Sequence, residues 1–189
     1  MMKGASIGVL LLAGLGLMGV WSQPGEADPI GRLPEFVIKD QNGTVLGPRS
    51  QASGTASVAV LMRDTINNET FDLQIAANSL RGADSNDVWY TNADCTGTAY
   101  VLEPAGASPI AEMRGSVYAV GRKAGATNED SVIVRGAGTG ANNDAAINSR
   151  FRTFAPGAPS CSASDPGVNT VQATQVMDLS TLVRPFVAE

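Results

Sequence analysis

The chain has 189 residues, of which 43% are hydrophobic, 16% are charged and 5% are aromatic, and it contains 2 cysteines and no histidine. Its net charge of −5 argues against a protein that binds nucleic acid through a basic face. The missing histidines exclude Ser-His-Asp and Cys-His catalysis and histidine-based zinc sites. The length fits one domain with a sizeable core.

Residues 1–27 have the features of a secretory signal peptide. A positive charge precedes the uncharged apolar run 7–20, which is too short to span a bilayer as a stable helix. Cleavage is expected after Gly25-Glu26-Ala27 or after Val20-Trp21-Ser22. We therefore expect the mature chain, 28–189, to be a single β-rich domain that is secreted or periplasmic and has no membrane attachment.

Short strands separated by turn residues dominate the mature chain. The pair Asn42-Gly43, between segments 35–40 and 44–46, predicts a β-hairpin with a type I′ turn, whose two central residues need positive φ. Segment 70–76 alternates apolar and polar residues, so its three large apolar side chains share one face. Further strands are expected at 57–62, 88–91, 98–102, 116–120, 131–135, 149–154 and 168–177.

About ten short strands with Gly, Asn, Asp and Pro between them are typical of an antiparallel sandwich or barrel. We therefore predict an all-β fold. Helical periodicity is missing from the mature chain, except that segment 178–183 has the pattern of one helical turn. Segment 136–148 is expected to be a loop, because it is rich in glycine and asparagine.

The two cysteines, Cys95 and Cys161, both follow the expected signal segment. An even number of cysteines in an exported chain favours an intramolecular disulfide. Closing the long loop between them is expected to stabilise the fold by about 4 kcal/mol. Two separate thiols or an intermolecular bridge are the alternatives. A catalytic thiol is not expected, because the sequence has no C-x-x-C motif and no histidine.

Three aromatic residues, Trp89, Tyr90 and Tyr100, form the candidate binding patch. Neighbouring residues in a strand point to opposite faces, so we expect one of Trp89 and Tyr90 to lie in the core and the other to be exposed. An exposed aromatic side chain near Cys95 would suit a glycan or a cell-surface protein as ligand. The alternative is that each aromatic is an ordinary core residue.

Acidic residues offer two other kinds of chemistry. The oxygen-rich segments 84–87 and 142–144 resemble calcium ligands, but Asp and Asn are also ordinary turn residues, so we expect turns with no metal or other cofactor. Two facing carboxylates would permit glycoside hydrolysis. No spacing marks out such a pair among the candidates Asp64, Glu69, Asp72, Glu103 and Glu112.

Basic residues are a further candidate for ligand binding. An anionic glycan would suit them, whereas the alternative is a solvated surface on which each cation pairs with a nearby acid. Arg150 and Arg152 share one face if their segment is a strand. The other members of this set are Arg114, Arg122, Lys123 and Arg135.

Three parts of the sequence carry a resemblance to a protein family: segment 37–47, segment 89–100, and Asp178-Leu179 with Pro185-Phe186. Their order resembles that of a loose family of uncharacterised bacterial exported β-rich proteins. In some of them a similar module is the head of a collagen-like stalk. The resemblance covers nearly the whole mature chain and implies fold but no catalytic residues. The Gly-X-Y stalk is missing here, so the resemblance leaves trimerisation and a fibre-tip role open.

The signal segment, the cysteine pair and the density of strands together predict an exported, non-enzymatic β-domain that binds a glycan or a cell-surface protein. One alternative is a structural subunit of an extracellular assembly, in which exposed strand edges join copies of the chain into a homo-oligomer. Another is a secreted hydrolase, which needs a cleft holding two carboxyl groups with raised pKa values.

Overall fold

The computed structural model describes residues 36–53, 57–82, 84–126, 130–153 and 159–189. All of them belong to one compact unit, 34–189. The expected signal segment lies outside the described residues, and so do Phe154 and the residues that lead into the first strand. No helix within the described ranges has the length and apolar character needed to cross a membrane.

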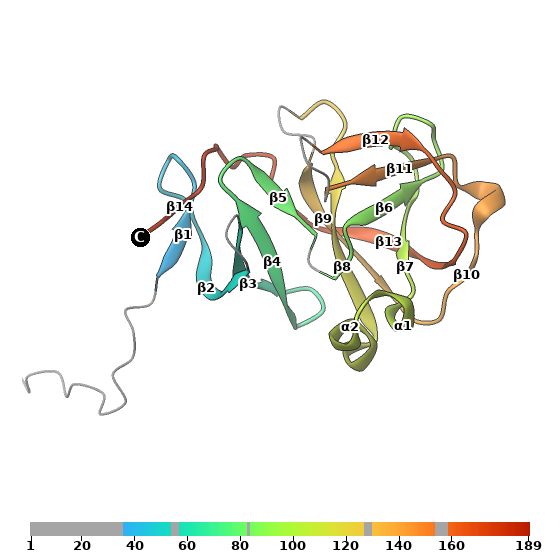
Figure 1. Ribbon diagram of the computed structural model, residues 1–189, viewed down its shortest axis with the longest axis horizontal. Helices are drawn as coiled ribbons and strands as arrows, with labels where there is room; N and C mark the ends of the chain where they lie inside the picture. Colours follow the sequence, from blue (N-terminus) through green and yellow to red (C-terminus); the bar gives the residue numbers. More distant parts are fainter. Residues whose placement is uncertain (1–35, 54–56, 83, 127–129, 154–158) are drawn as a thin grey trace, which may run out of the picture. The chain divides into compact units, whose positions relative to one another are not determined.

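Two antiparallel sheets make up this unit (Figure 1). The first has six strands in the order β14-β1-β2-β3-β4-β5. Its strands are β1 (Val37–Lys39), β2 (Val45–Ser53), β3 (Ser57–Asp64), β4 (Glu69–Ala76), β5 (Ser79–Arg81) and β14 (Val187–Ala188).

The second sheet has eight strands and follows the order β12-β11-β6-β7-β13-β9-β8, with β10 paired to β13. It curls like half of a barrel. Two short helices, α1 (Pro104–Ala107) and α2 (Pro109–Arg114), lie beside β8 (Figure 1). The strands are β6 (Asp87–Tyr90), β7 (Ala99–Leu102), β8 (Ser116–Arg122), β9 (Asp130–Ala137), β10 (Ala141–Asn142), β11 (Ser149–Arg152), β12 (Ser160–Ala163) and β13 (Asn169–Asp178).

The prediction of an all-β fold of short antiparallel strands is confirmed. The described strands number fourteen rather than about ten, because β5, β10, β12 and β14 have only two to four residues each. Strands this short carry too few residues for a period-2 pattern, and pairing with a neighbouring strand holds them in the sheet. The expected loop 136–148 contains β10 and a 3-10 turn at Asp144–Ala146.

Local capping explains the two helices that periodicity did not predict. Each begins with a proline, which suits the first helical position because its missing N–H would have no partner there. The Ser108 hydroxyl accepts a hydrogen bond from the Ala111 N–H at 3.1 Å and caps α2, and Gly115 ends that helix with a φ of 74°. The expected helical turn at 178–183 is wrong: β13 continues to Asp178, and a hydrogen-bonded turn follows it.

The first hairpin forms as predicted, but its turn is not type I′. Lys39 pairs with Val45, and Gly43 has a φ of 82°, whereas Asn42 is not among the residues with positive φ. The buried carboxylate of Asp40 decides the turn, because its Oδ1 accepts hydrogen bonds from the N–H groups of Asn42 at 2.9 Å and Thr44 at 2.7 Å. Because the Asp40 side chain binds the backbone N–H groups of its own turn, the turn is stable with only one positive φ angle.

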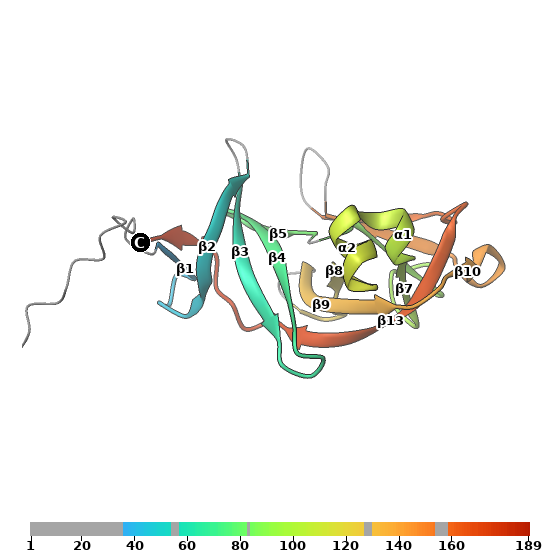
Figure 2. The same ribbon diagram turned by 90° about the horizontal axis from the view of Figure 1, so that it is seen from below.

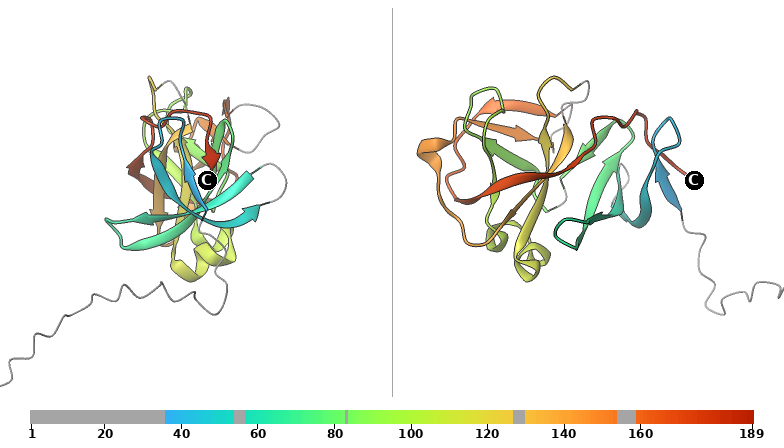
Figure 3. Two further views of the ribbon diagram at one scale, coloured as in Figure 1. Left: turned by 90° about the vertical axis from the view of Figure 1, so that its left-hand side faces the viewer. Right: turned by 180° about the vertical axis from the view of Figure 1, so that it is seen from behind.

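Buried side chains form two clusters. One fills the space between the two sheets and is joined by the C-terminal segment after β13, which crosses from the second sheet to β14 in the first (Figures 2 and 3). The other lies inside the curl of the second sheet and includes Val88, Tyr90, Val101, Phe151 and Val171. The first cluster comprises Ile38, Val60, Met62, Phe71, Leu73, Ile75, Leu80, Tyr118, Val120, Ile133, Leu179, Leu182 and Phe186.

Candidate functional site

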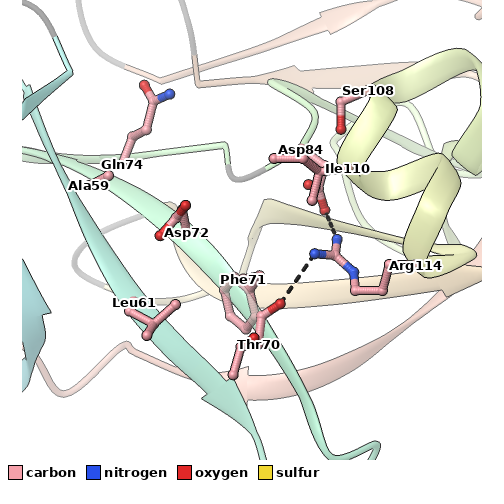
Figure 4. A pocket seen from close by; sticks show the side chains of 10 residues that line it. All are labelled: Ala59, Leu61, Thr70, Phe71, Asp72, Gln74, Asp84, Ser108, Ile110 and Arg114. Atoms are coloured by element: carbon pink, nitrogen blue, oxygen red, sulfur yellow. Dashed lines mark hydrogen bonds and ion pairs between the residues drawn. The ribbon is translucent and has the colours of Figure 1, made fainter. Parts of the chain in front are cut away.

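A cavity of about 330 Å³ lies between the β3–β4 hairpin and helix α2 (Figure 4). Its floor comes from the outer face of the first sheet, and its wall comes from α2 and the segment that leads into β6. Its size is near the lower end of the range of small-ligand pockets, about 300 to 1,000 Å³. It is lined by Ala59, Leu61, Thr70, Phe71, Asp72, Gln74, Asp84, Ser108, Ile110 and Arg114.

Strand alternation places the floor residues. Phe71, Leu73 and Ile75 of β4 face the core, as the sequence predicted. Asp72 and Gln74 therefore face the other way. The register sets Asp72 opposite Leu61 of β3, which is 44% exposed and gives the floor an apolar side.

Arg114 at the end of α2 joins the wall of the cavity to its floor. Its Nε donates to the Ser116 Oγ at 2.9 Å, and its Nη1 donates to the backbone oxygen of Thr70 at 3.2 Å. Its Nη2 forms an ion pair with Asp84 (Figure 4). The guanidinium also lies 4.8 Å from the ring centroid of Tyr118. The N–H donors of Arg114 are therefore bound to other groups of the protein.

Asp84 is a buried carboxylate beside this cavity. Burial raises its pKa above the usual value, and the negative charge of Asp72 raises it further, while the Tyr118 N–H at 2.8 Å and the Arg114 guanidinium act in the opposite direction. Asp72 and Asp84 both line this cavity.

One oxygen of the Asp72 carboxylate forms no hydrogen bond. Its Oδ1 is shielded from solvent and has no hydrogen-bond partner. Among the described residues, no basic side chain forms an ion pair with it, although Arg114 lines the same cavity. The Asp72 side chain lines the cavity, so a cationic donor from outside the protein would be stabilised beside its carboxylate.

The aromatic residues of the predicted patch lie elsewhere. Trp89 and Tyr90 are both 4% exposed, so the expectation that one of them is exposed is wrong. Tyr90 belongs to the cluster inside the second sheet, where its hydroxyl accepts from the Arg122 N–H at 2.9 Å and burial raises its pKa to about 12. Trp89 pairs in register with Arg150 on one side and Tyr100 on the other. A ligand at this patch stays a prediction.

The predicted disulfide between Cys95 and Cys161 is present, with a Cα–Cα distance of 6.0 Å. Cys95 is buried in the turn between β6 and β7, and Cys161 is exposed on the edge strand β12. The bond therefore ties an edge strand to the interior of the second sheet. Such a bond is typical of an oxidising compartment.

Two of the candidate acids, Asp64 and Glu69, come together at the end of the β3–β4 hairpin. Both accept hydrogen bonds from the Tyr118 hydroxyl, at 2.9 Å and 2.8 Å. Glu69 also forms a two-point ion pair with Arg135, which lowers the Glu69 pKa to about 2. The carboxylates of Asp64 and Glu69 are ionised and hydrogen-bonded to other residues of the protein, so their role is structural.

The oxygen-rich turns at Asp87 and at 142–144 have partners within the chain. The Asp87 carboxylate forms an ion pair with Arg152 at 2.8 Å and lies 3.9 Å from Arg150. Its oxygens therefore bind arginine side chains. The side chains of Asn142 and Asn143 hydrogen-bond to nearby backbone groups, as in ordinary turns. Over the described ranges, no three acidic or cysteine side chains gather in a group that could hold a metal ion.

The sequence analysis named every charged residue of the cavity as a candidate. It did not predict that these residues line one cavity. Asp72 was a candidate acid, Asp84 belonged to an oxygen-rich turn and Arg114 to a basic stretch. The alternation in segment 70–76 already placed Asp72 and Gln74 on the face away from the core. The missing information was the helix α2, which forms the facing wall.

A scan of protein-family models found no match to this chain, and searches of the curated proteins and of the solved structures found none either. The resemblance to exported head modules therefore stays a prediction, and the geometry of the cavity is what identifies the candidate site.

Proposed function

We propose that this protein is an exported, non-enzymatic β-domain that binds a molecule at a cell surface, and that the cavity beside Asp72 is its ligand site. The observation that carries the proposal is the Asp72 carboxylate, which lines a cavity of ligand size and forms no ion pair with a basic side chain of the described ranges. A binding site needs such unmet polar groups next to apolar surface. Leu61 and Ile110, which are 44% and 65% exposed, supply the apolar surface.

Export is the first part of the proposal to test. The N-terminal segment 1–27 and the disulfide support it. A mass spectrum of the protein recovered from the medium or the periplasm should show a chain that lacks the signal segment and two thiol hydrogens. A full-length chain with free thiols that stays inside the cell would contradict export.

Binding is the second part. The mature chain should be applied to an array of immobilised glycans and to a panel of purified cell-surface proteins. We expect saturable retention on at least one of these surfaces and loss of that retention in the Asp72→Asn variant. A folded, disulfide-bonded chain that is retained on none of them would contradict the proposal.

A carboxylate-dependent hydrolase is the second candidate, and one observation favours it. Asp72 and Asp84 line the same cavity, and burial together with the Asp72 charge raises the Asp84 pKa, as a general acid requires. Asp84 is also ion-paired with Arg114 and accepts from a backbone N–H, which favours its ionised, structural form. The geometry therefore supports binding better than hydrolysis.

Hydrolysis is tested on the same arrays. Release of soluble fragments from a polysaccharide, abolished in both the Asp72→Asn and the Asp84→Asn variants, would establish the second candidate in place of the first. Retention of the chain without fragment release is the result that the binding proposal predicts.

A further inference from the structure

We infer that the cavity beside Asp72 accepts the side chain of a lysine carried by a partner protein. This inference rests on the proposed function and specifies its ligand. It follows from the charge of the cavity, from the groups that are already engaged and from the apolar residues around its mouth.

The charge balance of the cavity calls for a cation. Three charged residues line it, and two of them, Asp84 and Arg114, neutralise each other in an ion pair. The carboxylate of Asp72 remains without a basic partner among the described residues, and its Oδ1 atom accepts no hydrogen bond.

An ammonium group supplies what Asp72 lacks. It brings one positive charge and three N–H donors, and a charge-assisted hydrogen bond to a carboxylate is about twice as strong as a neutral one. The terminal torsion of an aspartate is broad, so a small rotation turns either oxygen toward the incoming donor. Arg114 does not compete for this place, because Thr70, Asp84 and Ser116 hold its donors.

The rest of the lining favours an aliphatic stem. Leu61 of β3 and Ile110 of α2 both line the cavity (Figure 4), and both are well exposed. Lysine buries its methylene chain along apolar surface while its charged end finds a partner. The Ser108 hydroxyl already caps α2, so Thr70 and Gln74 are the other uncharged polar residues of the lining.

Competing cations fit this cavity less well. A guanidinium can form a two-point pair with one carboxylate, but its remaining N–H donors would then need further acceptors beside Leu61 and Ile110. An amino sugar carries several hydroxyl groups, and packing them against Leu61 and Ile110 would remove them from water without partners. The lysine side chain is therefore the cation that matches both the charge and the apolar walls.

The test is a binding titration of the exported, disulfide-bonded chain, labelled with nitrogen-15, followed by the amide resonances of β4 and α2. The probes are Nα-acetyl-lysine methylamide, the same molecule acetylated at Nε, and glucosamine. We expect saturable shifts with the first probe only. In the Asp72→Asn variant its affinity should fall by about tenfold or more, as loss of a hydrogen bond to a charged group predicts.

The Glu112→Gln variant is the matched control. Glu112 is an exposed residue of α2 that does not line this cavity, so its replacement removes the same charge nearby and should leave the affinity unchanged. The amide spectrum of each variant away from β4 and α2 must match the wild type, which separates loss of binding from loss of folding. The Nε-acetylated probe gives the same information without any variant.

Several results would overturn the inference. Equal binding of the acetylated and free lysine probes would remove the role of the ammonium group, and an unchanged affinity in Asp72→Asn would remove the role of the carboxylate. Shifts with glucosamine alone would assign the cavity to a glycan. Retention on a cell-surface protein that Asp72→Asn leaves intact would contradict this inference and the cavity as the ligand site, and it would keep only the proposal of binding at a cell surface. Binding of the lysine probe without retention on any surface would keep this inference and contradict the proposal of binding at a cell surface.

Discussion

The ring of Tyr118 lies stacked on the ring of Phe71, with the centroids 4.2 Å apart and the planes inclined by 8°. Tyr118 belongs to β8 of the second sheet and Phe71 to β4 of the first, so the stack joins the two sheets. The residue after Phe71 is Asp72, and the N–H of Tyr118 donates to Asp84. The contact between Phe71 and Tyr118 therefore also positions Asp72 on the floor of the cavity relative to Asp84 on its wall.

The Tyr118→Phe variant separates the stack from the hydroxyl. The ring and its contact with Phe71 stay, whereas the donor that serves Asp64 and Glu69 is lost. We expect the free energy of unfolding to fall by about 1 to 2 kcal/mol, the net cost of lost hydrogen bonds to charged groups that keep other partners. Urea denaturation measures this value. An unchanged free energy of unfolding would show that the hydroxyl contributes nothing.

The Asp72→Asn variant should not destabilise the protein. Asp72 makes no hydrogen bond through Oδ1, and its charge acts unfavourably on Asp84. We therefore expect the free energy of unfolding to stay the same or to rise by up to about 1 kcal/mol, as is common when a group kept for binding is removed. Urea denaturation of the variant beside the wild type tests this. A clear loss of stability would instead assign Asp72 a structural role.

Glu69 gives the fold an acid-sensitive contribution. The Arg135 guanidinium lowers the Glu69 pKa from its usual 4.5 to about 2. A pKa that is lower in the folded state stabilises the protein above pH 4.5, and this contribution is lost as the pH falls from 4.5 towards 2. The shift corresponds to at most roughly 3 kcal/mol, and because 20% of the Glu69 side chain is exposed, screening by solvent lowers this value.

The Glu69→Gln variant cannot ionise and provides the reference for that contribution. The difference in unfolding free energy between wild type and variant should be largest near neutral pH and should shrink as the pH falls from 4.5 towards 2. Denaturation curves over this range measure it. A difference that stays constant with pH would mean that the ion pair with Arg135 does not stabilise the fold.

The disulfide is expected to stabilise the domain by about 4 kcal/mol through the loop that it closes. The Cys95→Ser and Cys161→Ser variants should lose similar stability, because either change removes the same covalent bond. Urea denaturation, with the reduced wild type as control, tests this. If only one substitution lowered the unfolding free energy, packing around that cysteine rather than the bond would be responsible.

The sequence revealed those parts of the fold that depend on local patterns. The alternation in 70–76 identified the core face of β4, and the Asn42-Gly43 pair identified a hairpin. The turn type was wrong because the Asp40 side chain caps it, which the two central residues alone do not reveal. The burial of both Trp89 and Tyr90 was missed because alternation assigns residues to two faces without saying that both faces are covered.

The candidate site was harder to predict than the fold. Asp72, Asp84 and Arg114 come from three separate segments, and only the packing of α2 against the hairpin brings them to one cavity. Helix α2 has six residues, which is too short for a hydrophobic period, and its signals are a proline at the start and a glycine at the end. The unmet hydrogen bond of Asp72 is a property of three-dimensional packing and has no counterpart in the sequence.

The most direct test of the account compares three forms of the exported chain on a surface that retains the wild type. Wild type, Asp72→Asn and Glu112→Gln should be measured side by side by biolayer interferometry on the immobilised glycan or protein. We expect that Glu112→Gln binds like wild type and that Asp72→Asn loses about tenfold or more in affinity. Equal affinities of all three forms would contradict the assignment of the cavity beside Asp72 as the binding site.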